Sequence, residues 1–501
     1  MAEKIIEKYN LSCRGEIVDY RFIYLHFENV YDKKTIRLFL EKFFVFEDPN
    51  AKYTWAYKQG KWDGNIEFYK VVNENKNLYK TTYGLRNYIK YLGIKIINEP
   101  ETIRFEILEN QKIKIFDNII NNFRIEDLSY LRDYQFSALI QILKNEIGCI
   151  SMPTGSGKTL IPIALYQVLR FPILYIIHSK DLLYQTYNKF SEFFDKKDIG
   201  LVGDSNFDFK KITIATWETL YKRKVYPKNF EILIIDEAHR LPSKCYSQIV
   251  SKIPSRFRIA MSGSLFKRKD GRDLFLFAQF GGTIYKINFD YLSEENYILK
   301  PDVYIVKIPF FNNSNIKIQK FKFSDNFTID YHNLYEEEIV NNLYRNRKIA
   351  EISKLFYEKN KRILIFVRRI EHGKILKDLI KNDFGIQDVL FVSGLNSKYQ
   401  RQKAIEILKK KAFIIIATNI FEEGIDIPPL DVVINAGAGK SEISLLQKLG
   451  RLTRKTEGKE NAIYIDFYDL SYIFKRQSEE RINALKNQNF KIRIFDESIW
   501  N

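Results

Sequence analysis

Residues 153–159 read PTGSGKT, a stretch whose small and charged residues suit the binding of phosphate groups. Two glycines let backbone N–H groups close around phosphate oxygens, and a following helix adds the positive end of its dipole. Lys158 would then reach the β- and γ-phosphates, while the Thr159 hydroxyl would bind Mg²⁺. An ordinary glycine turn before a helix is the alternative. The residues of this predicted nucleotide site are Thr154, Gly155, Ser156, Gly157, Lys158 and Thr159.

Two carboxylates and an upstream amide complete the predicted chemistry. Asp236 and Glu237 stand at the end of the apolar run EILIID (231–236), which we interpret as a buried strand. In a parallel sheet that end lies on the same edge as the phosphate loop, where Mg²⁺ needs a second ligand. Glu237 could accept a proton from an attacking water. Gln135, ahead of the loop, could offer an amide donor and acceptor to adenine.

Apolar runs that alternate with helical segments must position these residues. In the first half the predicted strands are 147–152, 173–178, 211–216, 231–236 and 257–263. In the second half they are 362–367, 388–393, 413–418, 431–437 and 462–467, with helices near 371–382, 398–410 and 442–450. This alternation is typical of parallel α/β sheets. We therefore predict two parallel-sheet lobes, over residues 116–295 and 296–501, the second with a C-terminal helix.

Residues 1–115 are predicted to form a small α+β domain that recognises the substrate. Its clearest signals are strands in 16–27, a helix running into a strand over 35–46, and a hairpin over 53–72. The hairpin is rich in aromatic residues interleaved with lysines. The aromatic rings could stack on bases, and the lysines could contact phosphates. Packing in the domain core is the interpretation we favour for most of these rings: Trp55, Trp62, Phe68 and Tyr69.

Three other stretches carry weaker signals. Residues 116–130 are interpreted as a linker and a helix, 312–326 as a loop or hairpin, and 334–360 as one long helix. Residues 437–441, GAGKS, also follow a strand and resemble a phosphate loop. No acidic strand end follows them at a comparable distance, so we interpret this stretch as a turn with a surface lysine.

Composition narrows the class of protein. The net charge of +18 is spread over the chain, which favours a polyanion such as nucleic acid as partner. Hydrophobic residues at 45% and charged residues at 28% are typical of globular proteins. No apolar run is long enough for a membrane span, and the three cysteines form no C-x-x-C pair. We expect a cytoplasmic protein, in a bacterial or phage-infected cell, without membrane contact.

Taken together, the motifs resemble those of the superfamily 2 DExH-box helicases and translocases over roughly residues 130–470. The first lobe carries Gln135, PTGSGKT, the DEAH of 236–239, and Ser262-Gly263-Ser264. The second carries ATNIFEEGIDIP (417–428) and Gln447-x-x-Gly450-Arg451-x-x-Arg454. The chain departs from the family pattern at Met152, where a glycine is usual, and at 178–179, where His-Ser replaces Pro-Thr.

The resemblance implies two RecA-like lobes with ATP in the cleft between them. It assigns adenine recognition to Gln135, phosphate and Mg²⁺ binding to Lys158, Thr159 and Asp236, and water activation to Glu237. Gln447, Arg451 and Arg454 would reach the γ-phosphate, and Gly424 and Asp426 lie on the matching inter-lobe loop. Ser262 and Ser264 would couple the nucleotide state to the strand track. An arginine that arrives only when the lobes close stabilises transition-state charge only then, so hydrolysis is tied to lobe motion.

Within the superfamily, residues 53–70 and 78–93 resemble the N-terminal domain of the phage UvsW type of recombination helicase. That similarity implies an ATP-driven DNA helicase of recombination, replication or repair, active on forks, junctions and R-loops. It implies binding to branched, single-stranded or duplex DNA, extends to RNA–DNA hybrids, and predicts a monomer.

Two alternatives stay open: an RNA helicase, or a restriction-type DNA translocase subunit. A third, a scaffold with an inactive ATPase fold, is disfavoured because Lys158, Asp236, Glu237 and Arg454 are all present.

Overall fold

The computed structural model describes most of the chain. The described residues are 5–28, 33–48, 51–53, 55–116, 123–240, 248–263, 265, 273–309, 331–418, 430–439, 442–453, 459 and 462–496. By its internal contacts the chain divides into two compact units, one of residues 1–153 and 157–287, the other of residues 154–156 and 288–501. In the described ranges no helix combines the length and hydropathy of a membrane crossing.

The first parallel sheet lies within residues 147–286 and has the strand order β14-β13-β15-β12-β16-β17-β11-β18. Its strands are β11 Ile147–Ser151, β12 Ile173–Ile177, β13 Ile199–Gly203, β14 Asn206–Phe207, β15 Ile212–Thr216, β16 Ile232–Ile235, β17 Phe257–Ser262 and β18 Thr283–Lys286. All neighbours are parallel except β13 and β14. The helices around it are α4 Asp133–Asn145, α5 Leu160–Leu169, α6 Lys180–Ser191, α7 Trp217–Arg223 and α9 Asp273–Phe280.

Both faces of this sheet are covered, which explains why its strands are almost entirely apolar. One face packs on Leu220 of α7 and on Leu276 and Phe280 of α9. On the other face, Tyr175 of β12 meets Phe190 of α6 edge to face, with ring centroids 6.0 Å apart. The five strands predicted here from the sequence are confirmed.

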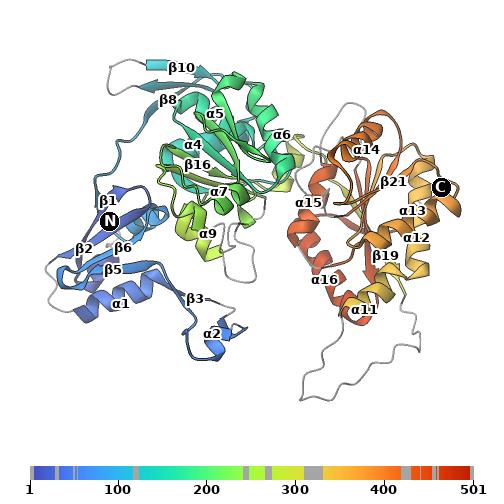
Figure 1. Cartoon of the computed structure of the whole chain (residues 1–501), viewed down its shortest axis with the longest axis horizontal. Helices are drawn as coiled ribbons and strands as arrows, with labels where there is room; N and C mark the ends of the chain where they lie inside the picture. Colours follow the sequence, from blue (N-terminus) through green and yellow to red (C-terminus); the bar gives the residue numbers. More distant parts are fainter. Residues whose placement is uncertain are drawn as a thin grey trace. The chain divides into compact units, whose positions relative to one another are not determined.

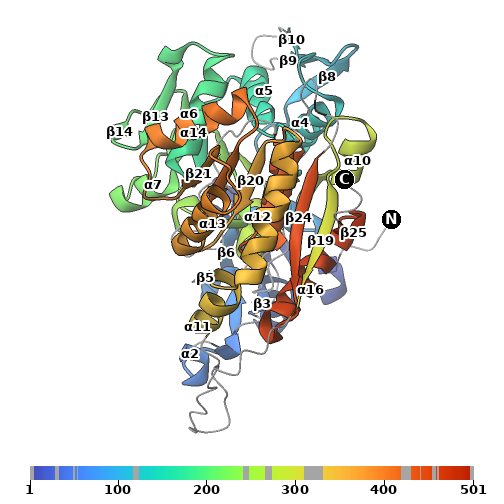
Figure 2. The ribbon, with the colours of Figure 1, turned by 90° about the vertical axis from the view of Figure 1, so that its right-hand side faces the viewer.

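The second parallel sheet lies in the second unit and has the order β21-β22-β20-β23-β24-β19-β25. Its strands are β19 Asp302–Ile308, β20 Ile363–Phe366, β21 Val389–Val392, β22 Ile414–Ala417, β23 Val432–Asn435, β24 Ile463–Asp469 and β25 Ile492–Ile494. Its helices are α10 Phe289–Glu294, α11 Tyr331–Tyr335, α12 Leu343–Glu358, α13 Ile370–Asn382, α14 Lys398–Lys410, α15 Glu442–Leu452 and α16 Tyr472–Lys486. Helices α12 and α13 cover one face, as Figure 2 shows, while α15 and α16 lie on the other (Figure 1). Both sheets are RecA-like, so the predicted fold class is confirmed.

The N-terminal part of the chain contains three smaller antiparallel or mixed sheets. The largest, in the order β5-β6-β2-β1-β7, comprises β1 Ser12–Asp19, β2 Phe22–Glu28, β5 Tyr69–Asn73, β6 Leu78–Thr82 and β7 Lys95–Ile97, with helices α1 Lys33–Phe44 and α3 Arg86–Tyr91. A two-stranded ribbon of β3 Val45–Glu47 and β4 Asn65–Glu67 leads to the short helix α2 Trp55–Lys58. The third sheet is formed by β8 Arg104–Leu108, β9 Lys112–Phe116 and β10 Phe123–Asp127.

This N-terminal part shares a hydrophobic core with the first parallel-sheet lobe. Ile147 of β11 and Ala278 of α9 belong to the same buried cluster as the residues of the five-stranded sheet. Gly84 lies so close to α9 that an added Cβ would stand 2.4 Å from the carbonyl oxygen of Ala278. The hydroxyl of Thr82 donates to that same oxygen at 2.6 Å. These contacts join both parts in one compact unit. The predicted domain boundaries at residues 115 and 295 stay predictions.

A buried ion-pair cluster reinforces the joint. Glu146, at the end of α4, accepts hydrogen bonds from Arg86 of α3 at 2.6 Å and from Arg256 at 2.5 and 3.1 Å. Arg86 also donates to the carbonyl of Asn145 at 2.9 Å. Arg86 and Glu146 are buried and Arg256 is nearly so. The N-terminal part is therefore held on the lobe by charge as well as by apolar packing.

Three sequence interpretations are wrong. Residues 53–72 do not form a hairpin, because β4 pairs with β3 while β5 pairs with β6. Residues 123–127, predicted as part of a linker and helix, form strand β10. The long helix predicted over 334–360 is broken into two. A π-helical turn ends at Val340, and α12 begins at Leu343, where the Asn342 side chain caps its first turn. The predicted loop or hairpin at 312–326 lies outside the described residues.

Candidate nucleotide-binding site

The phosphate-loop candidate joins β11 to α5 as predicted. Gly155 and Gly157 have φ angles of +88° and +72°, which glycine adopts without the strain that a side chain would bring. Helix α5 begins at Leu160, so Pro162 falls in its first turn, where a missing N–H removes no helical hydrogen bond. The backbone N–H of Met152 donates to the carbonyl of Ser262 at 3.0 Å. The start of the loop is thus fixed to the neighbouring strand β17.

Lys158 and Gln135 both hold the backbone of this loop. The Lys158 ammonium is buried and donates to the carbonyls of Met152 at 3.2 Å and Pro153 at 3.5 Å. The Gln135 side-chain amide donates to the carbonyl of Gly157 at 3.2 Å, while its oxygen accepts the N–H of Arg132 at 2.9 Å. Two polar side chains predicted from the sequence are therefore placed at the loop.

Asp236 and Glu237 follow β16 at the carboxyl edge of the same sheet. Asp236 is buried, and its carboxylate accepts hydrogen bonds from the Tyr175 hydroxyl at 3.0 Å and the Glu237 N–H at 2.9 Å. Glu237 has a φ of +49°, an uncommon conformation for a residue with a side chain. His239 places Nδ1 3.3 Å from the Glu237 carboxylate and 2.9 Å from the Ser262 hydroxyl. The acidic motif is thereby connected to the strand that precedes Ser264, which itself lies outside the described residues.

The charges of these groups influence one another. Burial and the neighbouring Glu237 charge raise the pKa of Asp236, against the opposing effect of Lys158. Burial would also raise the pKa of Glu237, but Lys158 and the hydrogen bond from His239 hold this pKa well below its usual value. The site therefore contains an ionised glutamate and a buried aspartate that a nearby cation would help to ionise.

The second lobe carries other predicted residues, only some of which can be placed. Gln447 and Arg451 belong to α15, but their side chains lie outside the described part of the structure. Gly424, Asp426 and Arg454 fall wholly outside the described residues. Their proposed roles stay predictions.

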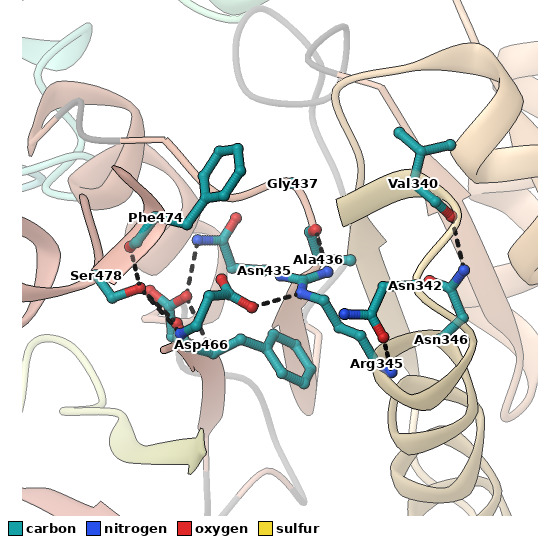
Figure 3. A network of polar contacts seen from close by, with 12 residues as sticks. Val340, Asn342, Arg345, Asn346, Asn435, Ala436, Gly437, Asp466, Phe474 and Ser478 are labelled. Carbon is teal, nitrogen blue, oxygen red and sulfur yellow. Dashed lines mark hydrogen bonds and ion pairs between the residues drawn. The ribbon is translucent and has the colours of Figure 1, made fainter. Parts of the chain in front are cut away.

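A buried polar network, drawn in part in Figure 3, holds α15 on the second sheet. The Lys448 ammonium donates to Asn435 at 2.8 Å and lies 5.3 Å from the centroid of the Phe366 ring. Asn435 donates to Asp466 at 3.2 Å, and Asp466 also accepts from the Arg481 guanidinium at 2.9 Å. These contacts fix the helix that carries Gln447 and Arg451 to β23, β24 and α16.

The second glycine-rich stretch, 437–441, has a different environment. The carbonyls of Ala436, Gly437 and Gly439 accept hydrogen bonds from Arg345 at 2.7 Å, Tyr335 at 2.7 Å and Arg481 at 2.6 Å respectively. Figure 3 shows Arg345 reaching Ala436. These side chains bind the loop by its carbonyl oxygens. Lys440 and Ser441 lie outside the described residues.

Sequence reasoning did not single out Tyr175 or Lys448. Tyr175 interrupts the otherwise aliphatic run ILYII, which is a weak signal for a polar contact at the sheet edge. Lys448 lies at a buried position of α15, between the apolar Leu445 and Leu452. A lysine in an apolar helical stripe was the signal that could have found it.

Comparison with known proteins gives two family matches. Residues 128–267 match the family described as "Type III restriction enzyme, res subunit", and residues 347–456 match "Helicase conserved C-terminal domain". "Putative helicase 22" of Sulfolobus islandicus filamentous virus is 28% identical over 87% of this chain and 78% of its own length. "ATP-dependent DNA helicase uvsW" of Enterobacteria phage T4 is 27% identical over 86% of both chains.

Solved structures support the fold. The fragment of a putative HsdR subunit of a type I restriction enzyme from Vibrio vulnificus superposes with a TM-score of 0.53, at 17% identity, over 82% of each chain. Two RecA-like lobes, helicase motifs in order and family matches in both lobes lead to one conclusion. This chain belongs to the superfamily 2 helicases, enzymes that use ATP hydrolysis to unwind nucleic acids.

Proposed function

We propose that the protein is an ATP-dependent DNA helicase that remodels branched DNA such as forks, junctions and R-loops, in the cytosol of a bacterial or phage-infected cell. The observation that carries the catalytic part is the cluster of Lys158, Asp236 and Glu237 at the carboxyl edge of the first sheet. The DNA part is supported by the phage T4 relative, whose name describes a DNA helicase and which aligns with most of the chain.

The described side chains fit the binding of ATP and Mg²⁺. We assign the phosphates to the loop 154–159, where two glycines with positive φ let N–H groups turn toward an anion. Thr159 and Asp236 would hold Mg²⁺, because the buried Asp236 carboxylate needs a positive partner to ionise. Bound there, Mg²⁺ would neutralise charge on the phosphates.

The roles of the remaining residues follow from their surroundings. Glu237 is ionised and can orient and deprotonate a water molecule. Lys158 must exchange its contacts with the Met152 and Pro153 carbonyls for phosphate oxygens when nucleotide binds. Gln135 would recognise adenine while keeping its oxygen on the Arg132 N–H. Gln447, Arg451 and Arg454 would complete the site from the second lobe, near Gly424 and Asp426.

The test is steady-state ATP hydrolysis by the full chain with no nucleic acid, linear single-stranded DNA, duplex, a fork, a four-way junction, an RNA–DNA hybrid and RNA. We expect the strongest stimulation by branched DNA. Preferential stimulation by RNA would instead identify an RNA helicase, and preferential stimulation by linear duplex a translocase of the restriction type. Sedimentation of the protein alone tests the proposed monomer.

A further inference from the structure

Residues 51–53 and 55–64 form a small folded cap at the end of the β3–β4 ribbon, and α2 is part of it. Figure 1 shows α2 beyond β3, away from α1 and the five-stranded sheet. We call these residues the aromatic cap, because they include Trp55, Tyr57 and Trp62. The function proposed above assigns them no role.

Hydrogen bonds give the cap a defined shape. The Asp48 N–H donates to the carbonyl of Gly64 at 2.8 Å, closing the base of the cap, and the Lys61 N–H donates to Ala56 at 2.9 Å. The Trp62 indole N–H donates to the carbonyl of Asn65 at 2.7 Å. Gly64 has a φ of +88°, and an added Cβ would stand 2.8 Å from Cβ of Ala51. The cap is therefore a built structure that holds its side chains in place.

The surface of the cap is aromatic and positively charged. Trp55 is 65% exposed, and the Lys61 ammonium lies 4.5 Å from the centroid of its ring. Lys52 and Lys58 are also exposed. The carboxylate of Asp63 accepts hydrogen bonds from the backbone and side chain of Asn65 at 2.9 and 3.0 Å. Two exposed rings on one short helix, Trp55 and Tyr57, indicate an interaction surface, and the lysines around them favour an anionic partner.

We propose that Trp55 stacks on an unpaired base at a DNA branch point, with Lys58 and Lys61 on the adjacent phosphates. Inside a continuous duplex each base is covered by its neighbours, whereas a branch point or single strand offers an open π-face. The cation–π contact holds Lys61 over one face of the Trp55 ring, so a base would stack on the opposite face and Lys61 would stay within reach of its phosphate. The inference rests on the proposed function, since it names the part of the chain that distinguishes a branch from linear duplex.

The experiment measures DNA binding by the full chain without ATP, using fluorescence anisotropy on a fork with unpaired arms and on a blunt duplex of equal length. We expect Trp55→Ala to weaken fork binding roughly tenfold or more while leaving duplex binding nearly unchanged. Trp55→Phe keeps a stacking ring and should stay close to wild type. Tyr91→Ala is the matched control, because Tyr91 is a 72% exposed aromatic on α3, outside the cap.

The lysines are tested by the salt dependence of fork binding. A Lys58→Ala, Lys61→Ala double variant should reduce the slope of log K against log salt by roughly 1.4, because each phosphate contact on a single strand contributes about 0.7. Basal ATP hydrolysis should be the same in all these variants.

The outcomes separate this inference from the function on which it rests. If wild-type hydrolysis and unwinding respond to branched DNA but Trp55→Ala binds the fork as tightly as wild type, the cap serves another partner and the inference is overturned. If the wild-type protein shows no preference for branched DNA, the proposed function fails first. Equal weakening of fork and duplex binding would also contradict the assignment, because it would show a contact that does not need an unstacked base.

Discussion

Removing the Glu146 carboxylate should weaken the joint between the N-terminal part and the first lobe about as much as a large-to-small substitution in their shared core. Glu146 is the shared partner of Arg86 and Arg256, and its side chain is only 7% exposed. In Glu146→Ala the Arg256 guanidinium loses the carboxylate that it binds, and Arg86 keeps only Glu99, whose carboxylate lies 3.9 Å away. Breaking a buried pair in this way costs about 3 to 5 kcal/mol. Glu146 already has a positive φ, so alanine adds no new backbone strain.

Urea denaturation followed by tryptophan fluorescence is a suitable assay. Three of the four tryptophans, Trp55, Trp62 and Trp217, belong to the first unit, so the signal reports mainly on that unit. With a slope of about 3 kcal/mol per M urea, the expected loss lowers the midpoint by about 1 to 1.7 M.

Two further variants control the interpretation. Glu106→Ala removes an exposed carboxylate that lies 3.8 Å from Lys114, and should change stability by less than about 0.5 kcal/mol. Adding Arg86→Met to Glu146→Ala removes one of the two stranded charges and should restore part of the loss. If Glu146→Ala shifts the midpoint no further than Glu106→Ala does, the cluster does not hold the two parts together.

The other predictions concern both lobes. Lys158→Ala should abolish ATP hydrolysis. Glu237→Gln should also abolish hydrolysis but still bind ATP, which filter binding of labelled ATP would measure. Unchanged turnover in either variant would contradict the site. Lys448→Met should destabilise the protein by about 1.5 to 3 kcal/mol by removing a charged buried hydrogen bond, whereas an unchanged denaturation midpoint would remove Lys448 from the network. Burial and the nearby Arg345 lower the pKa of His372 to about 3. Below about pH 6.5, His372 therefore binds a proton in the unfolded chain while it stays neutral in the folded protein. The free energy of unfolding should fall by about 1.4 kcal/mol per pH unit as the pH drops from about 6.5 toward about 3. His372→Gln should flatten that slope in urea titrations at stepped pH; an equal slope in both proteins would refute the assignment.

The strands of both lobes could be predicted because burial on two faces leaves little choice of residue. Runs such as ILYII and ILII are apolar throughout and bounded by polar residues, so their length and position are clear. Strand β10 was missed because its apolar residues are not buried. Phe123 and Ile125 are exposed, while Arg124 and Glu126 bind Val168 and Gln167 of α5. Hydrophobic periodicity cannot find a strand whose polar side chains face the protein.

The candidate site was predictable only in part, for a related reason. The phosphate loop and the acidic motif are short local patterns, and parallel strands bring their carboxyl ends to one edge whatever the distance in sequence. The hydroxyl that Tyr175 donates to Asp236, and the contact of His239 with Ser262, depend on which strands are neighbours. Nothing local encodes that order. The core that the five-stranded sheet shares with α9 was missed in the same way, since it joins segments about two hundred residues apart.

The shared core changes how substrate recognition can be tested. A deletion of residues 1–115 would remove Arg86 from Glu146 and uncover Ile147 and Ala278, which are buried against the five-stranded sheet. Loss of unwinding in such a deletion would follow from damage to β11, which leads directly into the phosphate loop, as readily as from loss of a DNA contact. Substitutions in the aromatic cap avoid this ambiguity, because Trp55 is exposed and lies outside the shared core. A branch-specific defect in Trp55→Ala that Trp55→Phe does not share, with normal basal hydrolysis in both variants, identifies the stacking contact as its cause.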